Sequence, residues 1–445
     1  MNRLPGLAAG IKDKLIQQAL ERKLRQACAP GAQAPARPAE KKAEVPEEHY
    51  RFHLHPGYQQ LRIINDGAKR LGVKNPFFTL HDGAAGSGTT IGGRAFINYA
   101  SYNYLDMSGD PVVAEAAKAA IDRYGTSVSA SRLVSGERPV HRELEMEIAS
   151  LYGADDAITF VSGHATNVST IGYLFGPRDL VLHDELIHNS VLQGIQLSGA
   201  SRLPFPHNDW EALHAILNEQ RHKFERVLIV LEGIYSMDGD YPDLPRFVDI
   251  KQRHRAFLMV DEAHSLGVMG ARGYGIREHF GLDGKDVDIW MGTLSKTLAG
   301  CGGYIAGETA LVEHLKFLAP GFLYSVGMPP SVAAASLAAL LRMKQLPDRV
   351  ATLQARGKYF LEQARAAGID TGTSTGLAVV PAITGSSLKA TRMSAALFQQ
   401  GINVQPILYP AVPEKSARLR FFISCTHTEE QIRTTIQSLS SVKQA

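Results

Sequence analysis

A lysine in a turn of small and hydroxylated residues is the first group in this sequence whose surroundings suggest covalent chemistry. Lys296 follows the apolar run Ile289–Met291, with Thr293 and Ser295 before it and the pair Gly302–Gly303 after it. Burial in a close-packed turn removes water from an amine and lowers its pKa, so that the neutral form can make a Schiff base with a carbonyl. The two hydroxyl groups are suited to bind a phosphate. The alternative is an ordinary surface lysine.

The motif Asp-Glu-Ala-His, residues 261–264, supplies a second set of reactive groups. It follows the apolar run Phe257–Val260, and an aspartate at the end of a buried strand needs a cationic partner. A protonated pyridine nitrogen is such a partner, and His264 could reach a hydroxyl group on the same ring. Together with a lysine beside a phosphate site, this pattern indicates pyridoxal 5'-phosphate (PLP), an electron sink that a protein orients and tunes.

The same four residues also occur in ATP-hydrolysing helicase-like proteins, which gives a rival interpretation. That interpretation requires a glycine-rich phosphate loop ending in Gly-Lys-Ser or Gly-Lys-Thr upstream. The nearest candidate, GAAGSGTT at 83–90, has no lysine. The sequence therefore disfavours an ATPase.

Three further turns follow apolar runs and carry candidate site residues. In an open α/β sheet, ligands bind beyond the carboxyl ends of the strands. Gly163 and His164 begin a small-residue turn that enters a helix, where free N–H groups suit a phosphate. His188 could stack on a flat ring, and Ser236 lies in a turn. Each has a simpler explanation, namely a plain strand-to-helix turn, an ordinary histidine and turn chemistry. The preceding runs are Ala157–Val161, Leu180–Leu182 and Val227–Leu231.

Two arginines near the C-terminus are candidates for binding a carboxylate. Strand alternation along Arg418-Leu419-Arg420-Phe421 puts Arg418 and Arg420 on one face. A guanidinium can hold a carboxylate through two parallel hydrogen bonds. We favour Arg420, because it lies deeper in the predicted strand; the alternative is that both arginines are solvated.

The elements that position these residues indicate an α/β fold. Short apolar runs separated by helical stretches favour a mainly parallel sheet covered on both faces. A long helical region, Pro330–Ala366, leads into a smaller α+β domain with two predicted strands and two predicted helices. We expect an N-terminal arm at 49–110, a large domain at 111–345 and a small C-terminal domain at 346–445.

Composition narrows the class of protein. The chain has 445 residues, 44% of them hydrophobic, which is enough for more than one core. A net charge of +3 is too small to suggest nucleic-acid binding. The three cysteines have no metal-like spacing and favour a reducing compartment, the cytoplasm, and we expect no metal site. No apolar run approaches the roughly 20 residues of a membrane span.

The first 48 residues differ from the rest. Residues 1–28 have the pattern of a basic amphipathic helix, and 29–48 are rich in proline, alanine and charge, as in a flexible linker. Such a helix can dock on a membrane surface or on an acidic partner such as an acyl-carrier protein. The simpler interpretation is an arm that packs on this protein or on a partner subunit.

Ten short motifs, from about Asn98 to the C-terminus, together resemble the α-oxoamine synthases, PLP enzymes of fold type I (aspartate-aminotransferase-like). Each motif alone is weak, but their order and spacing are specific. They are SYNYL (101–105), SRLVSG (131–136), SGHATN (162–167), HDELIHNS (183–190), EGIYSMDGD (232–240), VDEAHSLGV (260–268), GTLSK (292–296), GGYIAG (302–307), SVGMPP (325–330) and ARLR (417–420).

The resemblance implies a role for each candidate residue. Lys296 would carry the cofactor covalently and later move the proton at Cα, while Asp261 would pair with the pyridine nitrogen and His264 with the ring hydroxyl. His188 would stack on the ring and contact the substrate, and Arg420 would bind the amino-acid carboxylate. The remaining cofactor-binding residues would be Gly163, His164, Ser236 and Thr293.

The implied reaction joins an amino acid to an acyl thioester, from acyl-CoA or an acyl-carrier protein, with loss of CO2 and free thiol. The resemblance also implies a homodimer with sites between its subunits. The competing activities are a PLP aminotransferase or lyase of the same fold. A non-catalytic subunit of a synthase is disfavoured, because it would be expected to lack Lys296.

Several positions depart from the family pattern. His164 replaces an aromatic residue, Asp106 replaces a glycine, and Val326 and Gly327 replace hydroxyl residues thought to reach the neighbouring subunit's phosphate. The tyrosine at position 102 is more typical of serine palmitoyltransferases than of the alanine-using branch, where asparagine is common. Ser131 stands where glycine-using relatives tend to carry threonine. The smaller Ser131 leaves space for a substrate side chain, so we expect serine or alanine rather than glycine.

Overall fold

The computed structural model describes residues 45–70 and 75–444. The predicted helix at 1–28 and most of the predicted linker at 29–48 lie outside these residues. The chain divides into two units between residues 72 and 73. The described part of the first unit contains two short 3-10 helices and one α-helix: η1 (Glu47–His49), η2 (Phe52–Leu54) and α2 (Pro56–Arg70).

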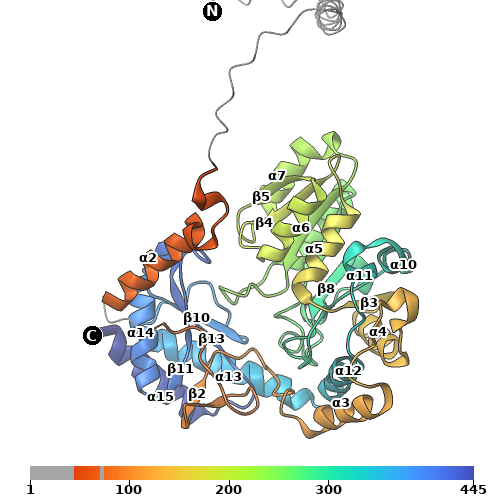
Figure 1. Cartoon of the computed structure of the whole chain (residues 1–445). Helices are drawn as coiled ribbons and strands as arrows, with labels where there is room; N and C mark the ends of the chain where they lie inside the picture. Colours follow the sequence, from red (N-terminus) through yellow and green to blue (C-terminus); the bar gives the residue numbers. More distant parts are fainter. Residues whose placement is uncertain (1–44, 71–74, 445) are drawn as a thin grey trace, which may run out of the picture. The chain divides into compact units, whose positions relative to one another are not determined.

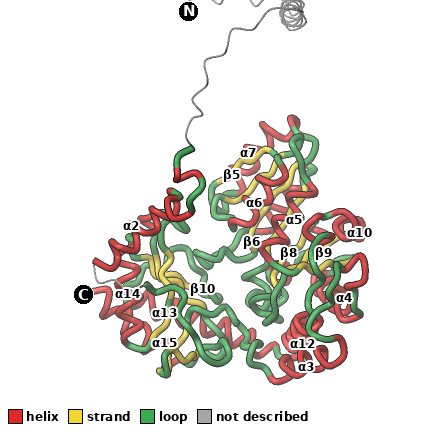
Figure 2. Tube along the Cα trace, in the orientation of Figure 1, coloured by secondary structure: helices red, strands yellow, loops and turns green. Residues whose placement is uncertain are grey.

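The second unit contains a seven-stranded central sheet (Figures 1 and 2). Its strand order is β3-β9-β8-β7-β6-β4-β5, and only β9 runs against its neighbours. The prediction of a mainly parallel sheet is confirmed. The strands are β3 (Asp156–Phe160), β4 (Leu180–Asp184), β5 (Ser201–Phe205), β6 (Val227–Glu232), β7 (Phe257–Asp261), β8 (Ile289–Thr293) and β9 (Gly303–Gly307).

Both faces of this sheet are buried. Successive residues of β6 alternate between two hydrophobic clusters, with Val227, Ile229 and Leu231 in one and Leu228 and Val230 in the other. Because both faces of such a strand are buried, its sequence is a continuous run of apolar residues. The flanking elements are α3 (Pro111–Tyr124), η3 (Arg132–Gly136), α4 (Pro139–Tyr152), α5 (Gly163–Leu174), α6 (Asn189–Ser198), α7 (Trp210–Gln220), η4 (Arg221–Lys223), α8 (Leu244–His254), α9 (Ile276–Phe280), η5 (Gly284–Asp286), α10 (Thr309–Leu318) and α11 (Pro320–Leu323).

Two three-stranded sheets accompany the C-terminal helices. One has the antiparallel order β10-β13-β12, and the other the order β1-β2-β11. The predicted long helical region is two helices, because a new helix begins at Pro347, which lacks an N–H group to continue the previous one. The elements are β1 (Gly88–Ile91), β2 (Arg94–Asn98), α12 (Pro330–Gln345), α13 (Pro347–Ala366), β10 (Val379–Ile383), α14 (Ser387–Gln399), β11 (Ile402–Asn403), β12 (Gln405–Ile407), η6 (Glu414–Ser416), β13 (Arg418–Phe422) and α15 (Glu429–Gln444).

The carboxyl edge of the central sheet positions the chemistry. Six of the seven strands run in one direction, so their last residues lie along one edge. Glu232, Asp261 and Thr293 are such last residues, on β6, β7 and β8. The domain boundaries expected at 110/111 and 345/346 stay a prediction; the second falls where α12 ends.

Candidate active site

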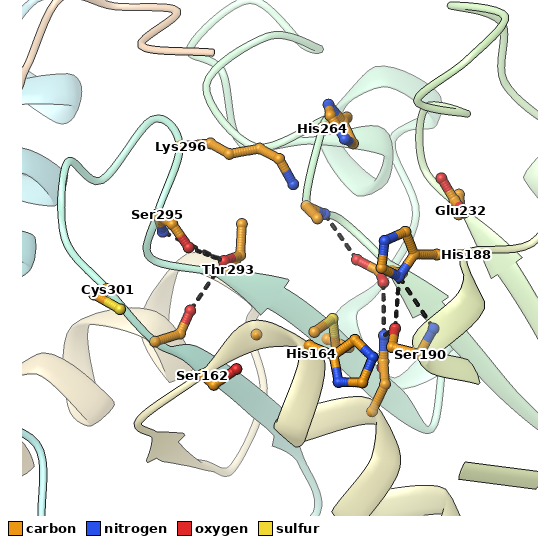
Figure 3. Close-up of a pocket in the computed structure, with 16 residues that line it drawn as sticks. Ser162, His164, His188, Ser190, Glu232, His264, Thr293, Ser295, Lys296 and Cys301 are labelled. Carbon is orange, nitrogen blue, oxygen red and sulfur yellow. Dashed lines mark hydrogen bonds between the residues drawn. The ribbon is translucent and has the colours of Figure 1, made fainter. Parts of the chain in front are cut away.

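A cavity of about 230 Å³ opens at the carboxyl edge of the central sheet (Figure 3). Its walls come from the turns that follow β3, β4, β7 and β8, which are far apart in the sequence. It brings together seven of the eleven residues singled out from the sequence: Gly163, His164, His188, Asp261, His264, Thr293 and Lys296.

The Lys296 amine points into this cavity, near His264 (Figure 3). Removal of water lowers the pKa of Lys296 to about 8, although the carboxylate of Asp261 opposes the shift. The amine lies 5.7 Å from the centre of the Tyr102 ring. A lysine of this pKa is partly neutral near physiological pH, which a carbonyl-condensing amine requires.

Asp261 is the last residue of β7 and is 4% exposed. Its Oδ1 accepts a hydrogen bond from the Ala263 N–H at 3.0 Å, and its Oδ2 accepts one from the Asn167 amide at 3.0 Å. No arginine, lysine or histidine of the described residues forms an ion pair with it. The cavity therefore presents a buried carboxylate that still needs a cation.

His188 caps the start of α6 and its ring lines the cavity. Its Nδ1 accepts from the Ser190 N–H at 3.3 Å and lies 2.7 Å from the Ser190 hydroxyl oxygen, which accepts from the Asn167 amide at 2.9 Å. The ring of His164 approaches it edge-on, with 6.4 Å between ring centres. Burial lowers the pKa of His188, and nearby Asp261 opposes this. His188 is consequently held in orientation as a largely neutral ring.

The turn at 162–164 forms another wall of the cavity and begins α5. The Ser162 hydroxyl accepts from the Ala165 N–H at 3.3 Å, and the first two residues of the helix, Gly163 and His164, line the cavity. A Cβ on Gly163 would lie only 2.8 Å from the Thr293 hydroxyl oxygen. Thr293 and Ser295 bond to each other at 2.7 Å. N–H groups at a helix start and two hydroxyls make a suitable anion site.

His264 is almost completely buried, and burial lowers its pKa, with a further contribution from Lys296. Its Nδ1 lies 2.7 Å from the Tyr104 hydroxyl. Its ring is nearly parallel to that of Phe422, with 6.1 Å between centres. The histidine is therefore neutral and rigidly placed.

Four predicted residues do not line this cavity. The Arg420 Nη1 donates to the Ser236 carbonyl at 3.2 Å, and the charge of Arg420 contributes to the lowered pKa of Lys296. Ser236 therefore contributes its main-chain oxygen to this contact. Tyr102 is connected to the cavity by the contact of its ring with the Lys296 amine. Ser131 accepts main-chain hydrogen bonds within its own turn and is not brought to the cavity.

The prediction that Arg418 and Arg420 lie on one face of a strand is confirmed, and the alternative that both side chains are solvated is wrong. Both reach the loop after β6: Arg418 pairs with Asp238 at 2.6 Å, and Arg420 contacts Ser236 and the Met237 sulfur.

Sequence reasoning missed other residues of the cavity. Glu232 is buried, and burial, with Asp261 nearby, raises its pKa well above the usual range. Asn167 is also buried and bonds to Asp261. Its position one helical turn after Gly163 was a signal that could have found it, since residues four apart share a helix face. Ser190 and Cys301 complete the missed set.

Two other classes of site are not found in the described residues. No group of histidine, cysteine and acidic side chains there could hold a metal ion. None of the helices at 45–70 and 75–444 combines the length and apolar character needed to cross a membrane.

Comparison with known proteins decides the family. A profile of the aminotransferase class I and II family matches residues 94–439. The 8-amino-7-oxononanoate synthase of Fervidobacterium nodosum is 37% identical over 386 residues, covering 86% of this chain and 97% of that protein. Serine palmitoyltransferase from Sphingomonas wittichii superposes with a TM-score of 0.83 at 28% identity, covering 87% of this chain and 98% of that chain. The chain belongs to the α-oxoamine synthase family.

This α-oxoamine synthase is accordingly a PLP-dependent acyltransferase of fold type I. A serine palmitoyltransferase from S. paucimobilis, solved with a bound PLP–myriocin aldimine, is 29% identical with a TM-score of 0.83, covering 87% of this chain and 98% of that chain. The resemblance to α-oxoamine synthases and the expected fold are both confirmed.

The cavity fits PLP on its own geometry. The buried Asp261 carboxylate, without a cation among the described residues, suits a protonated pyridine nitrogen. The start of α5 and the Thr293–Ser295 hydroxyl pair suit the phosphate. The Lys296 amine has a lowered pKa and reaches the same space. The α-oxoamine synthase therefore holds all three groups that PLP requires.

Proposed function

We propose that this chain condenses a small amino acid, serine or alanine rather than glycine, with an acyl thioester. The amino acid loses its carboxyl group as CO2, its α-carbon takes the acyl group, and the thiol is released, giving an α-aminoketone. The observation that carries the proposal is the Lys296 amine, with a pKa lowered to about 8, beside the buried Asp261 carboxylate. When bound, PLP supplies the electron sink that makes the amino-acid α-carbon acidic.

Each residue of the cavity has its own role in this reaction. Asp261, oriented by Asn167 and the Ala263 N–H, would hold the pyridine nitrogen of PLP in its protonated form. With PLP bound, His188 would cover one face of the ring and His264 would contact the ring oxygen. Gly163, His164, Ser236 and Thr293 would help to hold the cofactor, and of these the start of α5 and the Thr293 hydroxyl suit its phosphate.

Lys296 moves the proton at the α-carbon. An amine whose pKa is about 8 accepts and returns a proton near neutral pH, where catalytic groups work best. Arg420 binds the substrate carboxylate. Its Nη1 donates to the Ser236 carbonyl and to the Met237 sulfur, and its guanidinium lies 4.5 Å over the Phe422 ring. These contacts fix its direction and leave the Nε and Nη2 N–H groups for the substrate.

The choice of serine or alanine rests on Tyr102 and Ser131. Tyr102 is 41% exposed and its ring lies edge-on to Phe422, so it forms a wall beside Lys296. Ser131 stands in the turn just before η3, and its smaller side chain leaves room for a substrate side chain. We infer that Ser131 acts at a neighbouring subunit's site, because it does not reach the cavity of its own chain.

We propose a homodimer in which the usual hydroxyl contact to a partner's phosphate is absent. At the position of one such hydroxyl residue, a Cβ on Gly327 would lie 2.9 Å from Val128 and 3.0 Å from Arg132. The Gly327 N–H also donates to the Ala130 carbonyl at 2.9 Å. The close approach of the turn carrying Ser131 explains why glycine stands here, and Val326 offers no hydroxyl.

For the acyl donor, we propose a chain carried on an acyl-carrier protein. The basic charge predicted for residues 1–28 complements an acidic carrier. Deleting residues 1–48 should weaken binding of the carrier protein without changing activity on acyl-CoA. An unchanged dissociation constant would contradict the proposal.

The activity is tested by supplying single amino acids with an acyl thioester and measuring free thiol and CO2. We expect equal amounts of both products, with serine or alanine turned over faster than glycine. The competing aminotransferase or lyase would consume the amino acid without releasing thiol, and that result would overturn the proposed reaction.

A further inference from the structure

Tyr104 and His264 make a buried hydrogen bond that connects two distant parts of the chain. The Tyr104 hydroxyl lies 2.7 Å from His264 Nδ1, although the residues are 160 positions apart. Tyr104 is 0% exposed and His264 is 7% exposed. Tyr104 follows β2, whereas His264 stands in the turn after β7, beside the cavity.

The direction of this hydrogen bond can be decided from what else is present. Burial raises the pKa of Tyr104, so its hydroxyl keeps the proton. Among the described residues, His264 Nδ1 is the hydroxyl's one polar partner within hydrogen-bond distance. If Nδ1 carried a proton and donated, the buried Tyr104 hydroxyl proton would have no acceptor, which is costly. The hydroxyl therefore donates, and Nδ1 accepts.

The charge of His264 is fixed by the same surroundings. Burial lowers its pKa, the nearby charges of Lys296 and Arg420 lower it further, and its ring otherwise contacts Tyr104 and Phe422. A neutral imidazole has one protonated nitrogen. Because Nδ1 is the acceptor, the proton is on Nε2.

The Nε2 atom is the one that is free to act on a ligand. His264 lines the cavity, and no protein group of the described residues accepts from Nε2. Proteins select a histidine tautomer through the hydrogen bond that one ring nitrogen makes, which decides whether the other nitrogen carries the proton. Figure 3 shows His264 and the Lys296 amine at the same side of the cavity.

We propose that Tyr104 is a positioning residue that locks His264 in the Nε2–H tautomer and so presents a permanent hydrogen-bond donor to the ring oxygen of the cofactor. The tautomer of His264 follows from the contact with Tyr104 alone. The hydrogen bond from Nε2 to the cofactor rests on the proposed function, in which His264 lies beside the cofactor ring. A donor at this oxygen stabilises negative charge there and lowers the proton affinity of the adjacent imine nitrogen.

The tautomer is tested by 15N NMR of the full chain labelled at histidine, with the His264 signals assigned from a His264→Gln variant. We expect a protonated Nε2 and an unprotonated Nδ1 in the wild type. Tyr104→Phe keeps the ring but removes the donor, and should give a mixture of tautomers. A protonated Nδ1 in the wild type, or an unchanged tautomer in Tyr104→Phe, would overturn the inference.

Tyr152→Phe is the matched control. Tyr152 is also 0% exposed, and its hydroxyl bonds to Tyr304 at 2.8 Å, away from His264. Its replacement should leave the His264 tautomer unchanged. A change as large as that in Tyr104→Phe would mean that loss of any buried hydroxyl disturbs the site, and would also overturn the inference.

The consequence for the cofactor is tested on the PLP-loaded enzyme by following visible absorption against pH. Tyr104→Phe should move the midpoint of this titration upward by about one pH unit, a tenfold change in proton affinity. If the tautomer changes by NMR but the midpoint does not move, His264 does not act on the ring oxygen. That result would overturn this role of His264 while leaving the proposed condensation reaction intact.

Discussion

The Asn167 side-chain amide donates a 3.0 Å hydrogen bond to Asp261 Oδ2. Asn167 belongs to α5, whose first residues form the anion site, and Asp261 ends β7. The bond therefore connects the part of the cavity suited to a phosphate with the carboxylate suited to a pyridine nitrogen. Because both side chains are almost fully buried, little water can replace the bond if it is lost.

Replacing Asn167 with leucine should weaken PLP binding. The change keeps the side-chain size but removes a hydrogen bond to a charged group, which typically contributes about 1.5–3 kcal/mol. We expect the dissociation constant for PLP, measured by fluorescence quenching, to rise by about 10- to 100-fold.

Thr170→Val is the control for Asn167. Thr170 is equally buried on the same helix, but its hydroxyl has no hydrogen-bond partner among the described residues. Its replacement should leave PLP binding unchanged. Equal losses in the two variants would show that packing of α5 matters and that the bond to Asp261 does not.

The lowered pKa of Lys296 predicts a stability cost in the cofactor-free protein. The pKa is about 8 in the folded chain, against an ordinary value near 10.5. Between these values the unfolded chain binds more protons, so stability rises with pH from about 8 to 10.5 and the full cost is present below 8. Lys296→Met should therefore raise the free energy of unfolding at pH 7 by about 3 kcal/mol in urea denaturation. A destabilised variant would contradict the buried-amine account.

His207 should stabilise the loops around the cavity through two carboxylates. Its Nδ1 lies 2.9 Å from Asp184 and its Nε2 lies 3.0 Å from Asp240, and these bonds raise its pKa to about 10 despite partial burial. Asp184 ends β4, four residues before His188, and Asp240 belongs to the loop that carries Ser236. His207→Gln should destabilise the fold by about 3 kcal/mol at pH 6, because two buried carboxylates lose their cation.

The effect of His207 has a defined pH dependence. A histidine whose pKa is raised by folding contributes fully below its unfolded pKa of about 6.5, and the contribution is lost as pH rises to 10. The difference in unfolding free energy between wild type and His207→Gln should shrink steadily over this range. A constant difference would mean that hydrogen bonding or packing, and not charge, explains the role of His207.

The sequence predicts most of this site because its residues follow buried strands. Lys296, Asp261 and His188 were found from the apolar runs before them, and strand direction then brought them together. The edge strand β5, Ser201–Phe205, was missed because it is partly exposed and contains Pro204, which is tolerated at sheet edges.

Contacts between distant segments also could not be predicted from the sequence. No local pattern pairs Tyr104 with His264, or Asn167 with Asp261, since each bond depends on how separate elements pack. Ser131 shows the opposite case: a residue carried over from family resemblance lies outside the cavity of its own chain.

Arg420 should control amino-acid binding without affecting the cofactor. Arg420→Lys loses the paired N–H groups that match a carboxylate, so KM for the amino acid should rise about 10- to 100-fold while PLP absorption stays normal. Arg418→Lys is the control, since Arg418 pairs with Asp238 and should affect stability more than KM. Equal KM values for the two variants would contradict the assignment.

The most direct test of the account is to locate the cofactor on the chain. The PLP-loaded enzyme is reduced with borohydride, digested, and its peptides are weighed by mass spectrometry. We predict a pyridoxyl-phosphate group on Lys296 and none in Lys296→Ala. Attachment to another lysine, or no attachment in the wild type, would contradict the central role of Lys296.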